Sequence, residues 1–241
     1  MTAYVAGVDG CAAGWLVALR PLAHAAPVHL LVVPSFDEVL RLELRPQIVA
    51  VDMPIGLPDL GAAGGRACDV AARSVLGARQ SSVFAVPARA AVMCQSYARA
   101  CEVALARSQP PRKVSKQTFH LFAKIREVDA LMTPQLQSRV VECHPEAAFW
   151  AMNARVALAE PKKAKSRPFA PGLALRRSLL AAAGYDAGRL ADPPPSGADP
   201  DDVLDAMACA WTAARIAVGA AVRFPVSPSV DARGLRMEIW A

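Results

Sequence analysis

Residues Tyr4–Arg20 read YVAGVDGCAAGWLVALR and predict two short apolar strands that are joined by a glycine-containing turn. Side chains alternate along a strand, so Asp9 lies on the same face as Val5 and Gly7. The pattern marks this as a buried position, where an ionised carboxylate costs several kcal/mol or more unless something pairs with it. A metal ion would be one such partner, and Asp9 is therefore a candidate ligand.

The segments that follow predict more of the same sheet. Val28–Val33 (VHLLVV) has the pattern of a third strand, a short helix runs from Phe36 to about Leu44, and Gln47–Asp52 (QIVAVD) is a continuous apolar strand. Three consecutive strands, a crossover helix and a fourth buried strand give an α/β sheet with at least one parallel pair. Ser138–Cys143 (SRVVEC) resumes the strand pattern much later in the chain.

The residues between those last two strands are too numerous for a connecting loop. After a loop at Met53–Gly61, the chain from about Gly65 to Thr133 is mostly helical in pattern. We therefore expect a single domain over residues 1–241, with a helical insertion at about residues 61–137. The helices of this insertion are expected near Arg66–Leu76, Ser96–Arg107 and Lys116–Met132.

The C-terminal part of the chain predicts two more helices and a strand-like tail, LRMEIW. The first helix occupies Ala174–Ala183, and the lysine-rich stretch Pro161–Pro171 before it is polar and expected to be mobile. Asp199 is a good N-cap and Pro200 suits the first helical position. A long helix should therefore run from here to about Val218.

Carboxylates recur where an α/β sheet builds its functional site. Asp9 and Asp52 each end a predicted strand, and Glu142 lies near the end of another. The crevice of an open α/β sheet lies beyond these strand ends, so acids from different strands can converge there. Asp202 and Asp205 are three residues apart and share one face of the last long helix.

Such a group of acids, without a catalytic serine or cysteine motif, favours a hard cation such as Mg²⁺ or Mn²⁺. Two such ions about 3.5–4 Å apart can activate water and stabilise the leaving oxygen in phosphodiester cleavage. We expect Asp9, Asp52, Glu142 and Asp205 to be catalytic, with Glu142 as a further ligand or a general base. His144, in the turn that opens the next helix, is a conceivable acid or base.

The distribution of charge suits a polyanionic partner such as nucleic acid. The net charge is +6, and the segment from Arg66 to Glu127 holds 11 Lys or Arg against 3 Asp or Glu. Basic insertions on an acidic scaffold fit a site that binds cations at its centre and polyanions at its rim, although solvated helix faces would look the same. Candidate phosphate contacts are Arg66, Arg79, Arg89 and Lys116.

The cysteines and the apolar runs bear on the cellular compartment. Six cysteines are scattered without a C-x-x-C pair, which predicts reduced, buried thiols and no structural zinc site. No run approaches the roughly 20 apolar residues of a membrane span. The apolar N-terminus lacks the basic region of a secretory signal. We therefore predict a cytoplasmic protein without a membrane partner.

Several motifs, in order along the chain, resemble those of one known family. GVDGCAAGW, AVDMPIGLP, RACDVAARSVLGARQSSVFAVPARAAV, IREVDAL, VVECHPEAAF and DDVLDAMACA are similar to domain-of-unknown-function family number 429, which is described as predicted ribonuclease H-like nucleases. The resemblance extends from about Val5 to Gly219. It implies an α/β fold, a ribonuclease H-like mixed five-stranded sheet flanked by helices, with a helical insertion between the fourth and fifth strands.

More remotely, the outline is similar to the Holliday-junction resolvases. This resemblance implies that the metal ligands are Asp9, Asp52, Asp202 and Asp205. Asp52 stands where those nucleases usually have a glutamate, and the long insertion has no counterpart in them.

The function that these features favour is a divalent-metal-dependent nuclease. One alternative is a nucleotide-binding or phosphotransfer protein of the actin-like ATPase type, which normally needs a hydroxyl-bearing turn where this chain has Cys11-Ala12-Ala13-Gly14. Another is a non-catalytic nucleic-acid-binding or protein-binding module. The substrate stays open between DNA, RNA and a small phosphodiester, and a homodimer would favour a branched, two-fold substrate.

Overall fold

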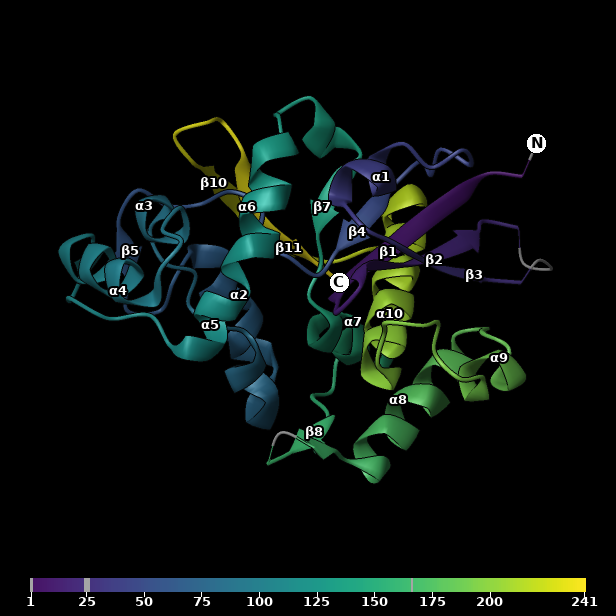
Figure 1. The fold of residues 1–241 in the computed structure, drawn as a ribbon. Coiled ribbons are helices and arrows are strands. Elements are labelled where there is room, and N and C mark those ends of the chain that lie inside the picture. Colours follow the sequence, from purple (N-terminus) through teal and green to yellow (C-terminus); the bar gives the residue numbers. More distant parts are fainter. Residues whose placement is uncertain (1, 24–26, 166) are drawn as a thin grey trace.

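The computed structural model of the chain describes residues 2–23, 27–165 and 167–241. Its centre is a five-stranded sheet in the order β3-β2-β1-β4-β7 (Figure 1). The strands are β1 (Tyr4–Cys11), β2 (Gly14–Pro21), β3 (His29–Val33), β4 (Val49–Val51) and β7 (Val140–Glu142). The pairs β1–β2 and β2–β3 are antiparallel, whereas β1–β4 and β4–β7 are parallel. This is the mixed sheet of a ribonuclease H-like fold, so the predicted fold class is confirmed.

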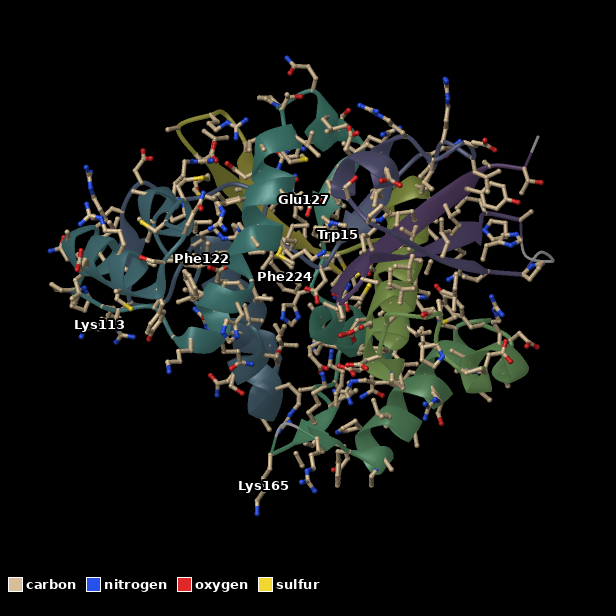
Figure 2. All side chains as sticks on the ribbon, in the orientation of Figure 1. Trp15, Lys113, Phe122, Glu127, Lys165 and Phe224 are labelled. Atoms are coloured by element: carbon tan, nitrogen blue, oxygen red, sulfur yellow. The ribbon has the colours of Figure 1, made fainter. Side chains whose placement is uncertain are left out.

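The alternation of side chains along β1 sends its residues into two separate cores. Ala6 and Val8 join the core beneath α1 (Phe36–Leu40) and α6 (Phe122–Leu131). Val5 belongs to the core on the other face, with α7 (Pro145–Met152), α8 (Ala170–Ala182) and α10 (Pro200–Ala217). The sheet is thus covered by helices on both faces. Figure 2 shows Trp15 and Phe122 inside the molecule, while Lys113 and Lys165 extend from its edge.

Helix α1 is shorter than the sequence predicted. The Ser35 side chain caps its N-terminus, but the helix ends at Leu40 and not near Leu44. Pro46 disfavours the helical conformation for the residue before it, and Arg45 adopts a positive φ of 40°. The chain then enters the sheet, where the Gln47 amide donates to the Tyr4 carbonyl.

The predicted helical insertion is confirmed between β4 and β7, where Figure 1 shows it beside the sheet. It contains α2 (Ala67–Val75), α3 (Arg89–Val92), α4 (Tyr97–Ala106), α5 (Lys116–His120) and α6, the short strands β5 (Gly61–Ala62) and β6 (Ser108–Gln109), and the 3₁₀ turns η1 (Gly77–Ser82) and η2 (Leu136–Ser138). The single helix predicted over Lys116–Met132 is in fact two, α5 and α6, which meet at Leu121.

The lysine-rich stretch contains two short strands that the sequence did not predict. It forms a short hairpin of β8 (Lys163–Ala164) and β9 (Arg167–Pro168), and α8 begins at Ala170, four residues before the predicted start. Pro171 lies in the first turn of α8, where a missing amide costs nothing. Helix α9 (Ala187–Ala191) and an irregular segment then lead to α10, whose N-cap Asp199 is confirmed.

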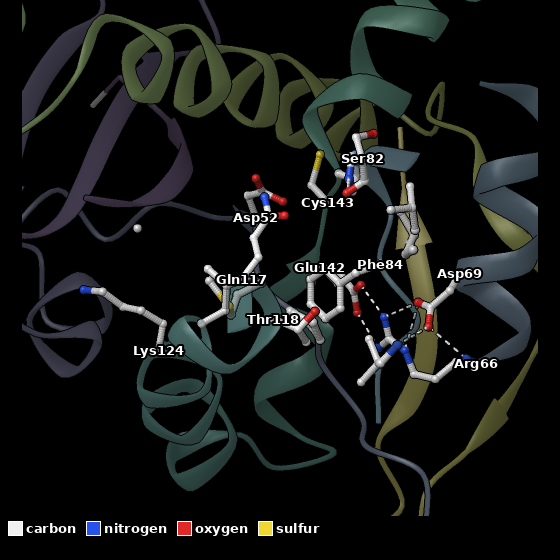
Figure 3. Close-up of a pocket in the computed structure, with 18 of the residues that line it drawn as sticks. Asp52, Arg66, Asp69, Ser82, Phe84, Gln117, Thr118, Lys124, Glu142 and Cys143 are labelled. Carbon is white, nitrogen blue, oxygen red and sulfur yellow. Dashed lines mark hydrogen bonds and ion pairs between the residues drawn. The ribbon is translucent and has the colours of Figure 1, made fainter. Parts of the chain in front are cut away.

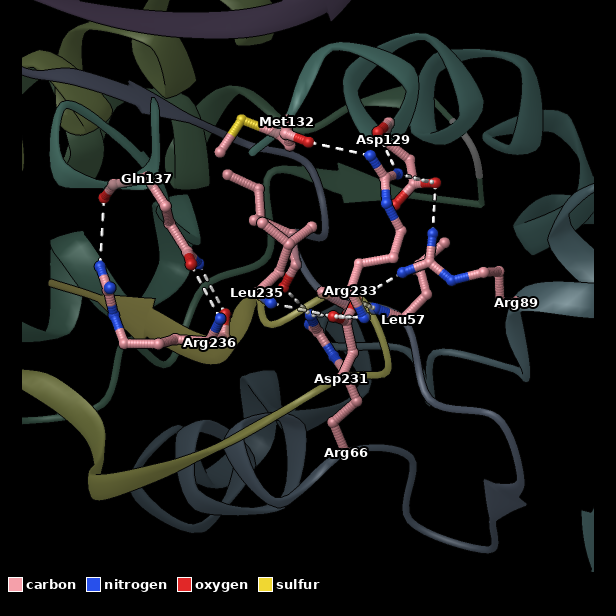
Figure 4. A network of polar contacts seen from close by, with 12 residues as sticks. Leu57, Arg66, Arg89, Asp129, Met132, Gln137, Asp231, Arg233, Leu235 and Arg236 are labelled. Atoms are coloured by element: carbon pink, nitrogen blue, oxygen red, sulfur yellow. Dashed lines mark hydrogen bonds and ion pairs between the residues drawn. The ribbon is translucent and has the colours of Figure 1, made fainter. Parts of the chain in front are cut away.

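The C-terminal residues form a hairpin of β10 (Arg223–Val230) and β11 (Arg236–Trp240). Ion pairs on two buried aspartates tie this hairpin to the insertion, with Arg89 bridging Asp129 and Asp231 while Arg233 contacts Asp129 at 3.0 Å (Figure 4). None of the helices in the described ranges combines the length and apolarity that a membrane crossing needs.

Candidate metal centre

Close packing of α10 against β1 brings the first and last predicted acids together. A Cβ added to Gly7 would lie 2.0 Å from both the Ala206 carbonyl oxygen and the Ala210 nitrogen, so only glycine allows this approach. Asp9 follows two residues later on the same face of β1, and Asp205 precedes Ala206 on α10. The short side chains on both elements therefore set how close the two carboxylates come.

Three carboxylates meet at the carboxyl ends of β1 and β4. One oxygen from each of Asp9, Asp52 and Asp205 lies within 4.8 Å of the others. Asp9 and Asp205 are buried, and Asp52 is half-buried. The structure thus brings together, from three separate elements, three of the four acids expected to bind metal.

The environment of the cluster favours protonated carboxyl groups unless a cation is present. Burial raises the pKa of Asp9 well above its usual range, and the charges of Asp52 and Asp205 add to this effect. Burial also raises the pKa of Asp52 to about 7, although Lys162 opposes it. The pKa of Asp205 is raised to about 7, again mainly by burial. Mutual repulsion of this kind is what a bound divalent cation relieves.

Lys162 is a member of this site that the sequence did not reveal. It precedes β8, and its ammonium group donates to Asp205 Oδ2. Burial lowers the pKa of Lys162, but the carboxylates of Asp205 and Glu146 raise it by more than this, so the amine is charged. Only its place in a lysine-rich stretch hinted at a role, because a contact across 43 residues depends on tertiary packing.

The fourth acid expected to bind metal lies outside the cluster. Asp202 Oδ2 accepts the backbone N–H of Asp199 at 2.8 Å, as part of a capping box at the start of α10. Its neighbour Asp201 pairs with Lys163 at 2.7 Å. Asp202 in the first turn thus caps the helix, whereas Asp205 faces the sheet.

Glu142 stands at the end of β7 as predicted, but its oxygens are already bound. Arg66 donates to both of them, at 2.8 and 2.6 Å, and the Ile55 amide donates at 2.7 Å. Arg66 also contacts Asp69 at 2.7 Å, so this ion pair is buried and saturated (Figure 3). Both oxygens of Glu142 are therefore engaged by Arg66, and every N–H of the Arg66 guanidinium has an acceptor, which leaves no free donor for a phosphate.

The other predicted substrate contacts lie in different surroundings. Arg89 is held by Asp129 and Asp231, away from the carboxylate cluster. Arg79 lies half-buried in η1, and Lys116 is exposed on α5. His144 is the N-cap of α7: its Nδ1 accepts the Glu146 amide at 3.2 Å, and burial lowers the pKa of its ring. The structure therefore gives His144 a capping role.

A pocket of about 400 Å³ opens beside the cluster, between the sheet and the insertion. Asp9 and Asp52 line it from the sheet, and the loop with Phe84 and the helices α5 and α6 line it from the insertion (Figure 3). Ligands of open α/β sheets bind at such strand ends. Asp9 and Asp52 thus face a cavity that a small molecule or part of a polymer could enter.

The fold and this cluster define an α/β protein with a ribonuclease H-like sheet and an acidic site that could hold a metal ion at its strand ends. The chain belongs to the family described as "Protein of unknown function (DUF429)", whose model matches residues 7–229. This match confirms the family predicted from the motifs. No curated protein and no solved structure gives a significant match.

Proposed function

We propose that this protein hydrolyses phosphodiester bonds of nucleic acid with the help of Mg²⁺ or Mn²⁺ bound at Asp9, Asp52 and Asp205. The observation that carries the proposal is the convergence of three carboxylate oxygens within 4.8 Å at the edge of an open pocket. Such oxygen donors suit hard divalent cations. When bound, the ion would polarise the phosphoryl oxygen and lower the pKa of an attacking water.

The hydrogen bonding of the cluster supports a cation there. Asp205 Oδ1 is buried, and no donor among the described residues lies within hydrogen-bond distance of it. Gly10 donates its amide to Asp9 Oδ1 at 2.7 Å, which leaves Oδ2 of Asp9 available. Buried polar atoms normally have partners, so an unpartnered carboxylate oxygen in a cluster of three acids supports a cation as its ligand.

The charge of the site also fits. When the three carboxylates are ionised and Lys162 is protonated, the cluster carries a charge of about −2, which one divalent cation neutralises. A second ion would need further negative charge, and the scissile phosphate of a substrate brings it. Lys162 neutralises one of the three acids through its contact with Asp205.

The alternative of an actin-like ATPase is less well supported. The turn between β1 and β2, where that fold would bind phosphate, lacks a hydroxyl group. The Ala13 amide in this turn donates to the Gly197 carbonyl at 3.2 Å and so is not free for a phosphate. Gly197 approaches so closely that an added Cβ would lie 2.2 Å from the Ala13 Cβ.

The test combines metal binding with cleavage. Titration calorimetry with Mn²⁺, and incubation with labelled single-stranded, duplex and branched DNA and RNA, would compare the wild type with Asp9→Asn and Asp205→Asn. Both variants should lose cleavage by more than about 100-fold, since even outer-shell partners of a metal cost 10–100-fold. Asp59→Asn, which changes an exposed acid outside the pocket, is the matched control and should cleave normally.

Two results would contradict the proposal. Cleavage that both variants retain would place the chemistry elsewhere or in a contaminant. A wild-type protein that binds no Mn²⁺ and cuts none of these substrates would instead be a binding module that keeps the fold.

A further inference from the structure

The pocket beside the carboxylates has a second half that the proposed metal chemistry does not use. Its volume of about 400 Å³ lies within the range of about 300–1,000 Å³ that small-molecule sites occupy. The carboxylates line one part, and the loop of Phe84 and the residues Gln117 and Thr118 line another. A group attached to a phosphate at the cluster would enter this second part.

Phe84 gives this part of the pocket an aromatic surface. Its ring is half-buried, and it packs on the core while still lining the pocket. Within the described ranges, no other aromatic ring stacks on it, whereas Phe119 nearby is paired with Tyr97 and Phe122 at centroid distances of 5.5 and 5.4 Å. Phe84 therefore contributes a half-buried ring to the pocket wall, with no other described aromatic ring stacked on it.

Polar side chains accompany this ring. Gln117 is exposed, and its amide, which can both donate and accept, makes no hydrogen bond to the described residues. The Thr118 hydroxyl contacts Ser115 at 2.9 Å, and this pair lines the same pocket. An aromatic face with adaptable donors and acceptors beside it is the combination that binds a single nucleobase.

We propose that the pocket binds one unpaired nucleobase next to the phosphate, with Phe84 stacking on the base and Gln117 contacting its edge. This inference rests on the proposed function, which places the phosphate at the carboxylates. A base within a duplex is stacked on both sides and cannot offer its face to Phe84. The substrate is then an unpaired nucleotide, either in a single strand or as a small nucleotide. The low aromatic content of 6% does not oppose this, because one ring suffices for one base.

The test measures nucleotide binding separately from catalysis. Titration calorimetry with adenosine, guanosine, cytidine and uridine 5′-monophosphates, in buffer with Mg²⁺, would compare the wild type with Phe84→Leu. Leucine keeps an apolar group but removes the ring, so binding should weaken by roughly 5- to 150-fold, the range expected for the loss of one base–aromatic stack. Gln117→Ala should weaken binding several-fold, and because Gln117 is exposed we expect this variant to fold normally.

Phe119→Leu is the matched control, because it removes a ring that does not line the pocket. It should bind as the wild type does, and thermal melting would check that both leucine variants are folded. Tighter binding of a short single strand than of a mononucleotide would identify a strand as the source of the base, and equal binding would identify a free nucleotide.

The outcomes separate this inference from the proposed function. Nucleotide binding that depends on Phe84, in a protein that cleaves nothing, would keep the base site and remove the nuclease. Cleavage of duplex as fast as of single strand, unchanged by Phe84→Leu, would keep the nuclease and overturn the base site. An absence of nucleotide binding, or binding that Phe84→Leu and Gln117→Ala leave unchanged, would also overturn it.

Discussion

The substitution Asp52→Asn should stabilise the metal-free protein at pH 8, although it removes a residue of the site. Asp52 accepts no side-chain hydrogen bond from the described residues, so an amide of the same shape loses little. The carboxylate, by contrast, must ionise beside Asp9 and Asp205. Burial raises its pKa from 3.8 to about 7. The folded protein therefore holds a proton between pH 4 and 7 that the unfolded chain has released.

This difference sets the sign and size of the effect. The stability of the wild type falls as the pH rises through this window, and stays lowered above pH 7. The rise in the pKa of Asp52 from 3.8 to about 7 corresponds to a loss of about 4 kcal/mol in the free energy of unfolding. The partial solvent exposure of Asp52 reduces this loss to about 2 kcal/mol. For a chain of this length, about 2 kcal/mol raises the melting temperature by roughly 4–8 °C.

Thermal melting in the presence of a chelator would measure this at pH 4 and pH 8. The Asp52→Asn variant should melt several degrees above the wild type at pH 8, and the two curves should converge at pH 4. Excess Mn²⁺ should then reverse the order at pH 8, because a ligand at about 100 times its dissociation constant adds about 2.7 kcal/mol only to a protein that binds it.

Asp59→Asn is the control for this experiment, since Asp59 is exposed and outside the pocket, and it should follow the wild type throughout. The reasoning would be refuted if Asp52→Asn melted at or below the wild type at pH 8 without metal. Burial would then not raise the pKa of the Asp52 carboxyl group as argued above.

Two further substitutions test how the fold builds the site. Gly7→Ala should displace α10 from β1, lower the free energy of unfolding by about 1–3 kcal/mol and weaken Mn²⁺ binding. Gly10→Ala on the same strand is the control, because its nearest contacts would be with the Lys124 side chain at 3.7 Å. Urea unfolding and calorimetry should show no change in stability or in Mn²⁺ binding for this control. Arg66→Met should lower the free energy of unfolding by about 3–5 kcal/mol, because it leaves the Glu142 and Asp69 carboxylates buried without a partner. Urea unfolding measures this. A decrease below about 1 kcal/mol, as expected for an exposed pair, would contradict the buried ion pair described above.

The sheet could be predicted from the sequence because its signals are local. Alternating apolar residues with a glycine turn identify β1 and β2, and Ser35 and Asp199 cap the helices that the pattern suggested. The break between α5 and α6 at Leu121 could not be predicted, since no glycine or proline marks it. Phe119 and Phe122, one on each side of the break, pack edge to face with their ring centroids 5.4 Å apart.

The candidate site was predictable only in part, because its pairs form over long distances in sequence. Asp9, Asp52 and Asp205 each follow a strand or lie on a packed helix, and the ends of parallel strands must converge. Nothing local shows, however, that Arg66 pairs with Glu142 across 76 residues, or that Lys162 reaches Asp205. The tertiary fold decides which acids are paired with basic side chains and which of them can bind a metal.

The same pairing changes how the basic insertion should be understood. Arg66 and Arg89 are taken up by buried carboxylates, and the guanidinium groups of Arg73 and Arg126 donate to backbone carbonyls. The carboxylates neutralise Arg66 and Arg89, so these two charges are not available to release counterions from a polyanion, and Arg73 and Arg126 keep their charge but are held in place within the insertion. Binding of a nucleic acid would then depend less on the net charge of this segment than on the contacts within the pocket. This favours a site that recognises one nucleotide closely over a surface that follows a long backbone.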